Sequence, residues 1–217
     1  MPMHLKRPSP FWDDEGWLGL SKRYPSPNCD ARPRGLPIDL LVIHHISLPP
    51  GRFSGDAVRD LFLNQLEVQT DPFYAQLLGL KVSAHFFIRR SGQLLQFVAC
   101  DQRAWHAGKS SFEGRKKCND FSIGIELEGD GEHQFTKRQY ARLALLTKRL
   151  LARYPLKNIV GHSDIAPGRK TDPGPYFDWP GYGDRLQQLS SQKQRKIFSE
   201  ARLVQLAESL RQRVRIS

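Results

Sequence analysis

The sequence has 217 residues, a formal net charge of +11, and ordinary proportions of hydrophobic and charged residues. These values suit a folded chain of one domain with an appendage and exclude a wholly disordered protein. No apolar run approaches the roughly 20 residues that cross a bilayer, and prolines and acidic residues interrupt the first twenty residues. Neither a membrane span nor a secretory signal is expected, which predicts a cytoplasmic protein.

The net charge bears on the possible partners, and the cysteines bear on disulfides and metal sites. Residues 185–217 hold eight Lys or Arg against two Glu, so much of the positive excess lies there. A basic surface can attract nucleic acid, anionic lipid or a substrate with carboxylates, and charge alone does not choose among them. The three cysteines are widely spaced and form no CxxC pair, which indicates reduced thiols rather than disulfides or a cysteine zinc site.

The first 66 residues predict a surface segment, a strand and a helix. Residues 1–36 are rich in Pro, Gly and charge, and three aromatic residues are expected to hold them on the domain: Trp12, Trp17 and Tyr24. Residues 39–45 form a short apolar run bounded by prolines, which predicts a buried central strand. Ser54 predicts the start of a helix. The apolar stripe of that helix consists of Val58, Leu61, Phe62 and Leu66.

The middle of the chain predicts a hairpin and a further strand. Residues 83–90 and 93–98 are rich in β-forming residues and flank Ser91-Gly92, which is typical of a two-residue hairpin turn. Residues 121–129 alternate between apolar and other residues, which predicts a strand with Glu126 on its less apolar face.

The last part of the chain predicts two helices and a short strand. Thr136 is expected to cap a helix whose apolar stripe ends before Pro155. Residues 158–162 predict a short strand that leads into a polar loop, and residues 199–214 predict a basic helix. Together the elements predict an α/β fold in which α-helices flank a central mixed β-sheet.

Three residues at strand ends or in the following loop are typical zinc ligands: His44, His162 and Asp172. A set of three ligands leaves one coordination position for water, which is the arrangement of a catalytic zinc site. Spacing by itself is weak evidence, because histidines far apart in a sequence are more often core or surface residues.

Five segments, in order, resemble one known family: VIHHISLPPGRF, VSAHFFIRR, RAWHAGKSSFEGR, CNDFSIGIELEG and GHSDIAPGRKTDPGPYFDW. They are similar to the AmpD family of 1,6-anhydro-N-acetylmuramyl-L-alanine amidases, a branch of the type 2 amidase fold shared with peptidoglycan recognition proteins. The resemblance covers about residues 12–182. Long ordered motifs of this kind are specific, whereas a single histidine is not.

The resemblance implies that His44, His162 and Asp172 bind zinc, and that Glu126 and Lys170 are catalytic. A metal ion lowers the pKa of bound water toward about 7, so that a carboxylate such as Glu126 can deprotonate it for attack on an amide. Zinc and the Lys170 ammonium then stabilise the negative charge on the former carbonyl oxygen. No covalent enzyme intermediate is expected.

The resemblance also implies substrate contacts by His45, Lys81, Lys117 and Arg169. His45 stands where the family often has asparagine, and it points to the strand face opposite His44, so packing is its alternative role. Lys81 and Lys117 replace expected arginines and lack a bidentate fork, and solvated surface charge is their alternative.

Other polar residues near these motifs have simpler interpretations. Glu128 shares a strand face with Glu126 and is the alternative base. His85 and His106 are expected to be structural or to line the pocket.

The implied function is zinc-dependent hydrolysis of the amide between (1,6-anhydro-)N-acetylmuramic acid and L-alanine in cytoplasmic peptidoglycan recycling, with an indirect effect on beta-lactamase induction. The expected partner is an anhydromuropeptide, without membrane or nucleic acid, and the expected state is a monomer. Residues 1–36 would be an N-terminal surface segment, 37–184 the zinc amidase domain, and 185–217 a basic helical extension.

Three alternatives remain. They are a non-catalytic module that binds peptidoglycan fragments, an exported amidase of the intact wall, and a nucleic-acid-binding protein that uses the basic end of the chain.

Overall fold

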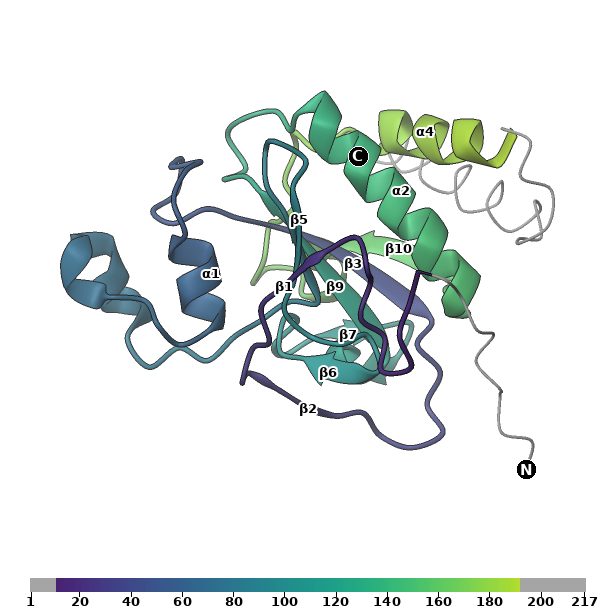
Figure 1. The fold of residues 1–217 in the computed structure, drawn as a ribbon, viewed down its shortest axis with the longest axis horizontal. Coiled ribbons are helices and arrows are strands. Elements are labelled where there is room, and N and C mark those ends of the chain that lie inside the picture. Colours follow the sequence, from purple (N-terminus) through teal and green to yellow (C-terminus); the bar gives the residue numbers. More distant parts are fainter. Residues whose placement is uncertain (1–10, 192–217) are drawn as a thin grey trace.

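The computed structural model describes residues 11–191, so the basic helix predicted at residues 199–214 lies outside the described part. A six-stranded sheet forms the centre of the molecule, in the order β1-β5-β4-β9-β3-β10 (Figure 1). Its strands are β1 Lys22–Arg23, β3 Leu40–Ile46, β4 Phe86–Ile88, β5 Leu94–Gln96, β9 Ser122–Glu128 and β10 Asn158–Gly161. Strands β4, β9, β3 and β10 run parallel, β5 is antiparallel to β4, and β1 is parallel to β5. The predicted mixed sheet is therefore confirmed.

The two longest strands of the sheet, β3 and β9, lie side by side and are mostly buried. The first five residues of β3 and all seven residues of β9 are buried. Parallel strands buried on both faces are rich in Val, Ile and Leu, as β3 is at its start. On β9, Ile123, Ile125 and Leu127 belong to the main core, as their alternation predicted. The residues between them, including Glu126, point to the other face.

Helix α2, Lys137–Arg153, packs over one face of the sheet beside α4, Trp179–Ser191 (Figure 1). Thr136 caps α2 as predicted: its hydroxyl accepts a hydrogen bond from the Gln139 backbone, and the Gln139 side chain accepts one from the Thr136 backbone. This reciprocal capping box satisfies two backbone donors at the start of the helix. The predicted stripe is buried and forms much of the main core.

A second apolar cluster lies under the segment that follows β3. This segment contains α1 Ala57–Phe62 and two short 3-10 helices, η1 Val68–Thr70 and η2 Pro72–Leu77. The predicted helix exists, but its predicted cap is wrong. The residue before its first turn is Asp56, which makes no side-chain capping bond, and Leu66 lies beyond the last turn.

The remaining elements are short. Strand β2 Cys29–Ala31 pairs with β6 Gln102–Ala104, and β7 Ser111–Phe112 pairs with β8 Arg115–Lys116. Helix η3, Cys118–Asp120, precedes β9, and helix α3, His162–Ile165, follows β10. All three cysteines are free, as predicted. Within residues 11–191 no helix has the length and apolar character needed to cross a bilayer.

The predicted domain limits cut across continuous structure. Trp12 and Leu18 belong to the main core, and β1 adds an edge strand to the central sheet, so residues 11–36 are more than a surface segment. Helix α4 continues across residue 184 without a break. The limits at residues 36 and 184 therefore do not mark separate folding units, and the division of the chain into three functional segments stays a prediction.

Candidate metal centre and active site

Adjacent parallel strands bring the predicted metal ligands together. His44 lies near the carboxyl end of β3, and β10 pairs with β3 so that Gly161 is opposite Ile43. His162 follows directly as the first residue of α3. Because neighbouring parallel strands end at the same edge of a sheet, both imidazoles reach one point. Asp172 comes from the loop after α3, where its carbonyl accepts a hydrogen bond from the Ser163 backbone at 2.9 Å.

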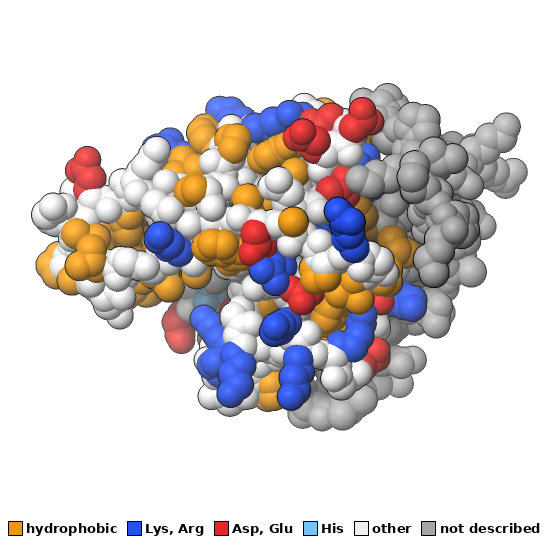
Figure 2. Space-filling model, turned by 90° about the horizontal axis from the view of Figure 1, so that it is seen from below, with side chains coloured by type: hydrophobic (Ala, Val, Ile, Leu, Met, Phe, Trp, Pro, Cys, Tyr) orange, Lys and Arg blue, Asp and Glu red, His pale blue; other side chains and the backbone are white. Residues whose placement is uncertain are grey.

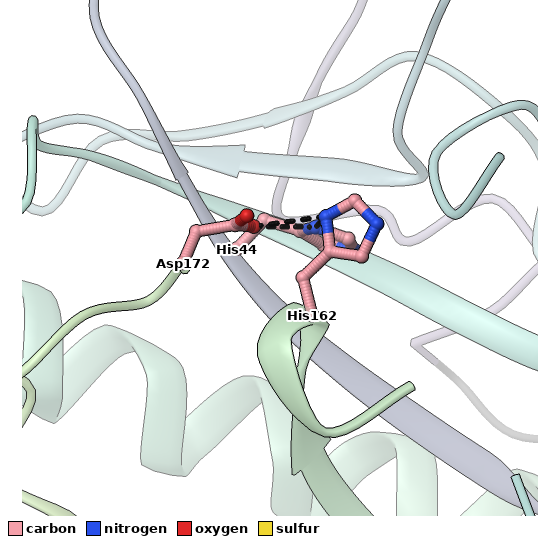
Figure 3. Close-up of side chains that lie close together, drawn as sticks. All are labelled: His44, His162 and Asp172. Atoms are coloured by element: carbon pink, nitrogen blue, oxygen red, sulfur yellow. Dashed lines mark hydrogen bonds and ion pairs between the residues drawn. The ribbon is translucent and has the colours of Figure 1, made fainter. Parts of the chain in front are cut away.

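The three side chains converge on a common point (Figure 3). His44 Nδ1 lies 3.0 Å from His162 Nδ1 and 3.0 Å from Asp172 Oδ2, and His162 Nδ1 lies 3.1 Å from the same oxygen. Ligand atoms around tetrahedral zinc, with bonds of about 2.0–2.1 Å, lie roughly 3.3 Å apart. The donor set and its nearly equal spacing therefore fit a divalent cation such as zinc after a small opening of the triangle.

The protonation states of His44 and Asp172 also suit metal binding. Burial lowers the pKa of His44 to about 4, so its imidazole is neutral at physiological pH. Burial raises the pKa of Asp172, but its close contacts with the imidazoles of His162 and His44 outweigh this effect and hold the pKa well below its usual range. Metal ions require neutral imidazole and ionised carboxylate as ligands.

The outer ring nitrogen of each histidine has its own partner. His162 Nε2 donates to the Ala107 carbonyl at 3.1 Å, and His44 Nε2 lies 2.9 Å from His106 Nδ1. Such outer contacts orient metal-ligating histidines in proteins. His106 was expected to be structural or pocket-lining. Its contact with a candidate ligand was missed because sequence spacing carries no sign of it.

Glu126 lies beside the candidate metal ligands. It is the register partner of His44 on the neighbouring strand and is buried. Among the described residues, its Oε2 is one of few buried polar atoms without a hydrogen-bond partner. Burial and then the Asp172 carboxylate raise the pKa of Glu126 well above its ordinary value, which the Lys170 ammonium partly opposes. A buried carboxylate with an open oxygen can accept and release a proton.

The alternative base, Glu128, is already engaged. Its Oε2 accepts a hydrogen bond of 2.7 Å from the Arg90 backbone. Lys170 is exposed, and its charge acts on both Glu126 and His44. These surroundings favour Glu126 and Lys170 over Glu128 as chemical groups.

The four residues predicted to contact substrate lie in different settings. His45 is half-buried; its Nε2 would lie 3.0 Å from a Cβ placed on Gly131 and 4.0 Å from one placed on Gly174, in the loop that also holds Asp172. Arg169 donates from one terminal nitrogen to the Ala107 carbonyl at 2.7 Å and to the Lys109 carbonyl at 2.8 Å. Lys81 and Lys117 are exposed. Their contacts with substrate stay predictions.

The fold is that of a family of amidases. The chain belongs to the N-acetylmuramoyl-L-alanine amidase family, whose model (Amidase_2) matches residues 34–175. It is 52% identical to the 1,6-anhydro-N-acetylmuramyl-L-alanine amidase AmpD of Escherichia coli (strain K12) over 168 residues, which cover 76% of this chain and 92% of that protein. It is 51% identical to AmpD of Salmonella typhimurium (strain SL1344) over 183 residues, which cover 83% of this chain and 97% of that protein.

Solved structures agree with these relatives. The crystal structure of a selenomethionine derivative of AmpD matches with a TM-score of 0.76 and 50% identity, and the match covers 81% of this chain and 97% of that chain. The E. coli amidase AmiD, solved in complex with "the substrate anhydro-N-acetylmuramic acid-L-Ala-D-gamma-Glu-L-Lys", matches with a TM-score of 0.52 and 31% identity. That match covers 80% of this chain and 65% of the AmiD chain. The expected family and fold are therefore confirmed.

Proposed function

We propose that the protein is a zinc-dependent amidase that hydrolyses the bond between 1,6-anhydro-N-acetylmuramic acid and L-alanine in muropeptides. The main support is the convergence of His44, His162 and Asp172 beside a buried carboxylate that has an open oxygen. Identity of about half to AmpD relatives, over nearly their whole length, supports this choice of substrate. The substrate named for AmiD has the same sugar and the same first amino acid.

His44, His162 and Asp172 would hold the zinc ion. Zinc, when bound, polarises the amide carbonyl and lowers the pKa of a water molecule that it coordinates. Glu126 would orient the attacking water, take its proton, and deliver a proton to the leaving amine. Its raised pKa suits it to hold this proton between the two transfers. Lys170 would stabilise the negative charge that develops on the former carbonyl oxygen.

The substrate would be held by groups around the metal centre. Among the described residues, the other two guanidinium nitrogens of Arg169, Nε and Nη1, make no hydrogen bond, and they are suited to a peptide carboxylate. Lys81 and Lys117 would offer single ammonium groups, and His45, near Gly174 in the loop that holds Asp172, would contact the sugar or peptide. We further propose that the enzyme acts as a monomer in the cytoplasm on fragments of recycled wall.

One comparison of substrates tests this function. Metal-replete protein is incubated with anhydromuramyl-tripeptide and with intact wall sacculi, and the zinc content and the peptide released are measured. Stoichiometric zinc with rapid release from anhydromuramyl-tripeptide is the expected result. Binding of the fragment without release would identify a non-catalytic module of the same fold. Comparable release from sacculi would instead indicate an amidase of the intact wall.

A further inference from the structure

We propose that His106 is a positioning residue that holds His44 in the tautomer able to bind metal. In this tautomer the proton is on Nε2, and the Nδ1 lone pair faces His162 and Asp172. The inference rests on the proposed zinc site. It adds a residue that touches neither the metal nor the substrate.

Four groups form a chain of hydrogen bonds whose direction is fixed at one end. The Cys118 carbonyl can only accept, so the Ser122 hydroxyl donates to it at 2.6 Å. Ser122 Oγ therefore accepts from His106 Nε2 at 3.1 Å. A neutral imidazole carries one proton, so His106 Nδ1 is an acceptor. It accepts from His44 Nε2 at 2.9 Å, which leaves His44 Nδ1 without a proton.

Asn119 and Gly124 hold His106 in place. The Asn119 side-chain oxygen accepts hydrogen bonds from the His106 backbone at 3.2 Å and from the Ala107 backbone at 2.8 Å. The imidazole lies against the backbone of Gly124, where an added Cβ would come within 2.5 Å of the ring. Only glycine leaves this space on β9. The ring therefore has little freedom to turn away from His44.

The same short segment orients the second histidine ligand. The Ala107 carbonyl accepts from His162 Nε2 at 3.1 Å and from Arg169 at 2.7 Å. A carbonyl cannot donate, so this contact needs the His162 proton on Nε2. Arg169 Nη2 also lies 3.4 Å from His162 Nε2 and can only donate, but this contact is longer than the 3.1 Å contact with the carbonyl, which favours the proton on Nε2. Residues 106 and 107 thus favour the metal-binding tautomers of both imidazole ligands, one through a side chain and the other through the backbone.

The opposite tautomer of His44 is a real competitor. With a proton on Nδ1, His44 would donate to Asp172 Oδ2, which is only 3.0 Å away. That hydrogen bond would occupy both a ligand nitrogen and a ligand oxygen. Because His106 accepts a hydrogen bond from His44 Nε2, it opposes this arrangement before any metal arrives.

The experiment compares His106→Leu and His106→Asn with the unaltered full-length chain. Leucine removes the acceptor, whereas the Asn side-chain oxygen stands near the position of Nδ1 and keeps it. Zinc affinity is measured by competition with a chromophoric chelator. The tautomers of the metal-free protein are read by multiple-bond ¹H–¹⁵N NMR. We expect about a 10–100-fold loss of zinc affinity in His106→Leu, as for other outer-shell partners of ligating histidines. The His44 proton should move to Nδ1, and His106→Asn should recover most of the affinity.

Two serine variants keep the test decisive if His106→Leu does not fold. Ser122→Ala removes the acceptor that orients His106 and is expected to weaken zinc binding several-fold. Ser110→Ala is the matched control, because this buried hydroxyl bonds to the Gly108 carbonyl and the Cys118 backbone but to no histidine. It should bind zinc normally.

The outcomes separate this inference from the proposed function. Failure of the unaltered chain to bind zinc would reject both. Normal zinc binding by the unaltered chain, by His106→Leu and by Ser122→Ala would reject only the role of His106. Equal losses in His106→Leu and His106→Asn, with an unchanged His44 tautomer, would reduce His106 to a packing residue.

Discussion

Glu126 and Glu128 lie two residues apart on β9 and meet different surroundings. Glu128 accepts a hydrogen bond from the Arg90 backbone, whereas Glu126 has an open oxygen beside the candidate metal ligands. Their hydrogen bonding therefore distinguishes two carboxylates that the sequence alone offers as alternative catalytic bases.

We expect Glu126→Gln to retain zinc and lose at least about 100-fold in turnover, because general acid–base catalysis contributes roughly 10²–10⁴. Glu128→Gln is the matched control and should keep turnover within about twofold while losing about 1 kcal/mol of stability. Zinc content and initial rates on anhydromuramyl-tripeptide measure both. A normal rate in Glu126→Gln would move the base to another residue.

The raised pKa of Glu126 also predicts how the metal-free protein responds to pH. Burial favours the neutral acid, so the folded state holds its proton at pH values where the unfolded chain releases it. The stability that this proton contributes is complete below the unfolded pKa of about 4.3 and is lost as pH rises. Metal-free Glu126→Gln, which stays neutral, should therefore exceed the unaltered chain in Tm by roughly 2–4 °C at pH 8, for about 1 kcal/mol. The Tm difference should shrink at pH 4, where both chains hold a neutral side chain at this position. Equal Tm values of the two chains at pH 8 would contradict the assignment.

Asp172 tests the metal centre directly. Asp172→Ala removes the one anionic ligand and should weaken zinc binding by more than the roughly 10–100-fold of an outer-shell change, with activity lost in parallel. Asp71→Ala, which removes a carboxylate bonded to the Phe73 backbone, is the control and should bind zinc normally. Near-normal turnover of Asp172→Ala would contradict the assignment.

Sequence patterns predicted the groups at this site better than their contacts. The residue types of His44, His162 and Asp172, set in long motifs, were sufficient to predict a ligand set. The bonds from His106 and Ala107 were not predictable, because they depend on a carbonyl direction and on space above Gly124. The orientation of an imidazole ring depends on the packing around it, and the spacing of residues in the sequence does not predict that packing.

Helix starts show the same limit among the secondary-structure elements. Thr136 and Gln139 form a capping box that follows from local residue types, and α2 begins where predicted. Ser54 has the right chemistry but the chain turns at Gly55, which has a φ of 81°, and α1 begins only after Asp56. Local caps are predictable when the helix is long and amphipathic, whereas short helices follow their tertiary contacts.

An ion pair links strands β2 and β6, and it predicts that stability falls at acid pH. Arg103 forms two hydrogen bonds with its cross-strand partner Asp30 and a third with Asp120 near β9. The hydrogen bonds from Arg103 hold the pKa of Asp30 below its usual value.

A carboxylate whose pKa is lowered by folding stabilises the folded state at pH values above the pKa of aspartate in the unfolded chain, about 3.9. This contribution is lost as the pH falls below about 3.9 and through the lower pKa of the folded state. Because Asp30 is 40% exposed, solvent screening keeps the effect below about 1 kcal/mol. Asp30→Asn should therefore be slightly less stable at pH 7 and equal to the unaltered chain near pH 2, measured by urea unfolding. A difference that persists undiminished at pH 2 would show that the pair acts by packing rather than by charge.

At the scale of the whole molecule, positive charge occurs both on the described residues and at the end of the sequence. On the face drawn in Figure 2, several Lys and Arg side chains lie close together in the lower part of the view, and Asp and Glu side chains occur between others. Residues 192–217 add seven Lys or Arg against two Glu, and they lie beyond the family match, which ends at residue 175. The candidate ligands, the candidate base and His106 all precede residue 192.

This separation predicts that the catalytic chemistry does not need residues 192–217. A chain that ends at Ser191 should bind zinc as tightly as the full chain and release peptide from anhydromuramyl-tripeptide with kcat/KM within about twofold, or 0.4 kcal/mol. Any retention of the full chain on immobilised DNA should depend steeply on salt and be lost on truncation, because phosphate contacts are electrostatic. A loss of kcat/KM above about tenfold, with the truncated chain still folded by circular dichroism, would instead place residues 192–217 within the catalytic unit.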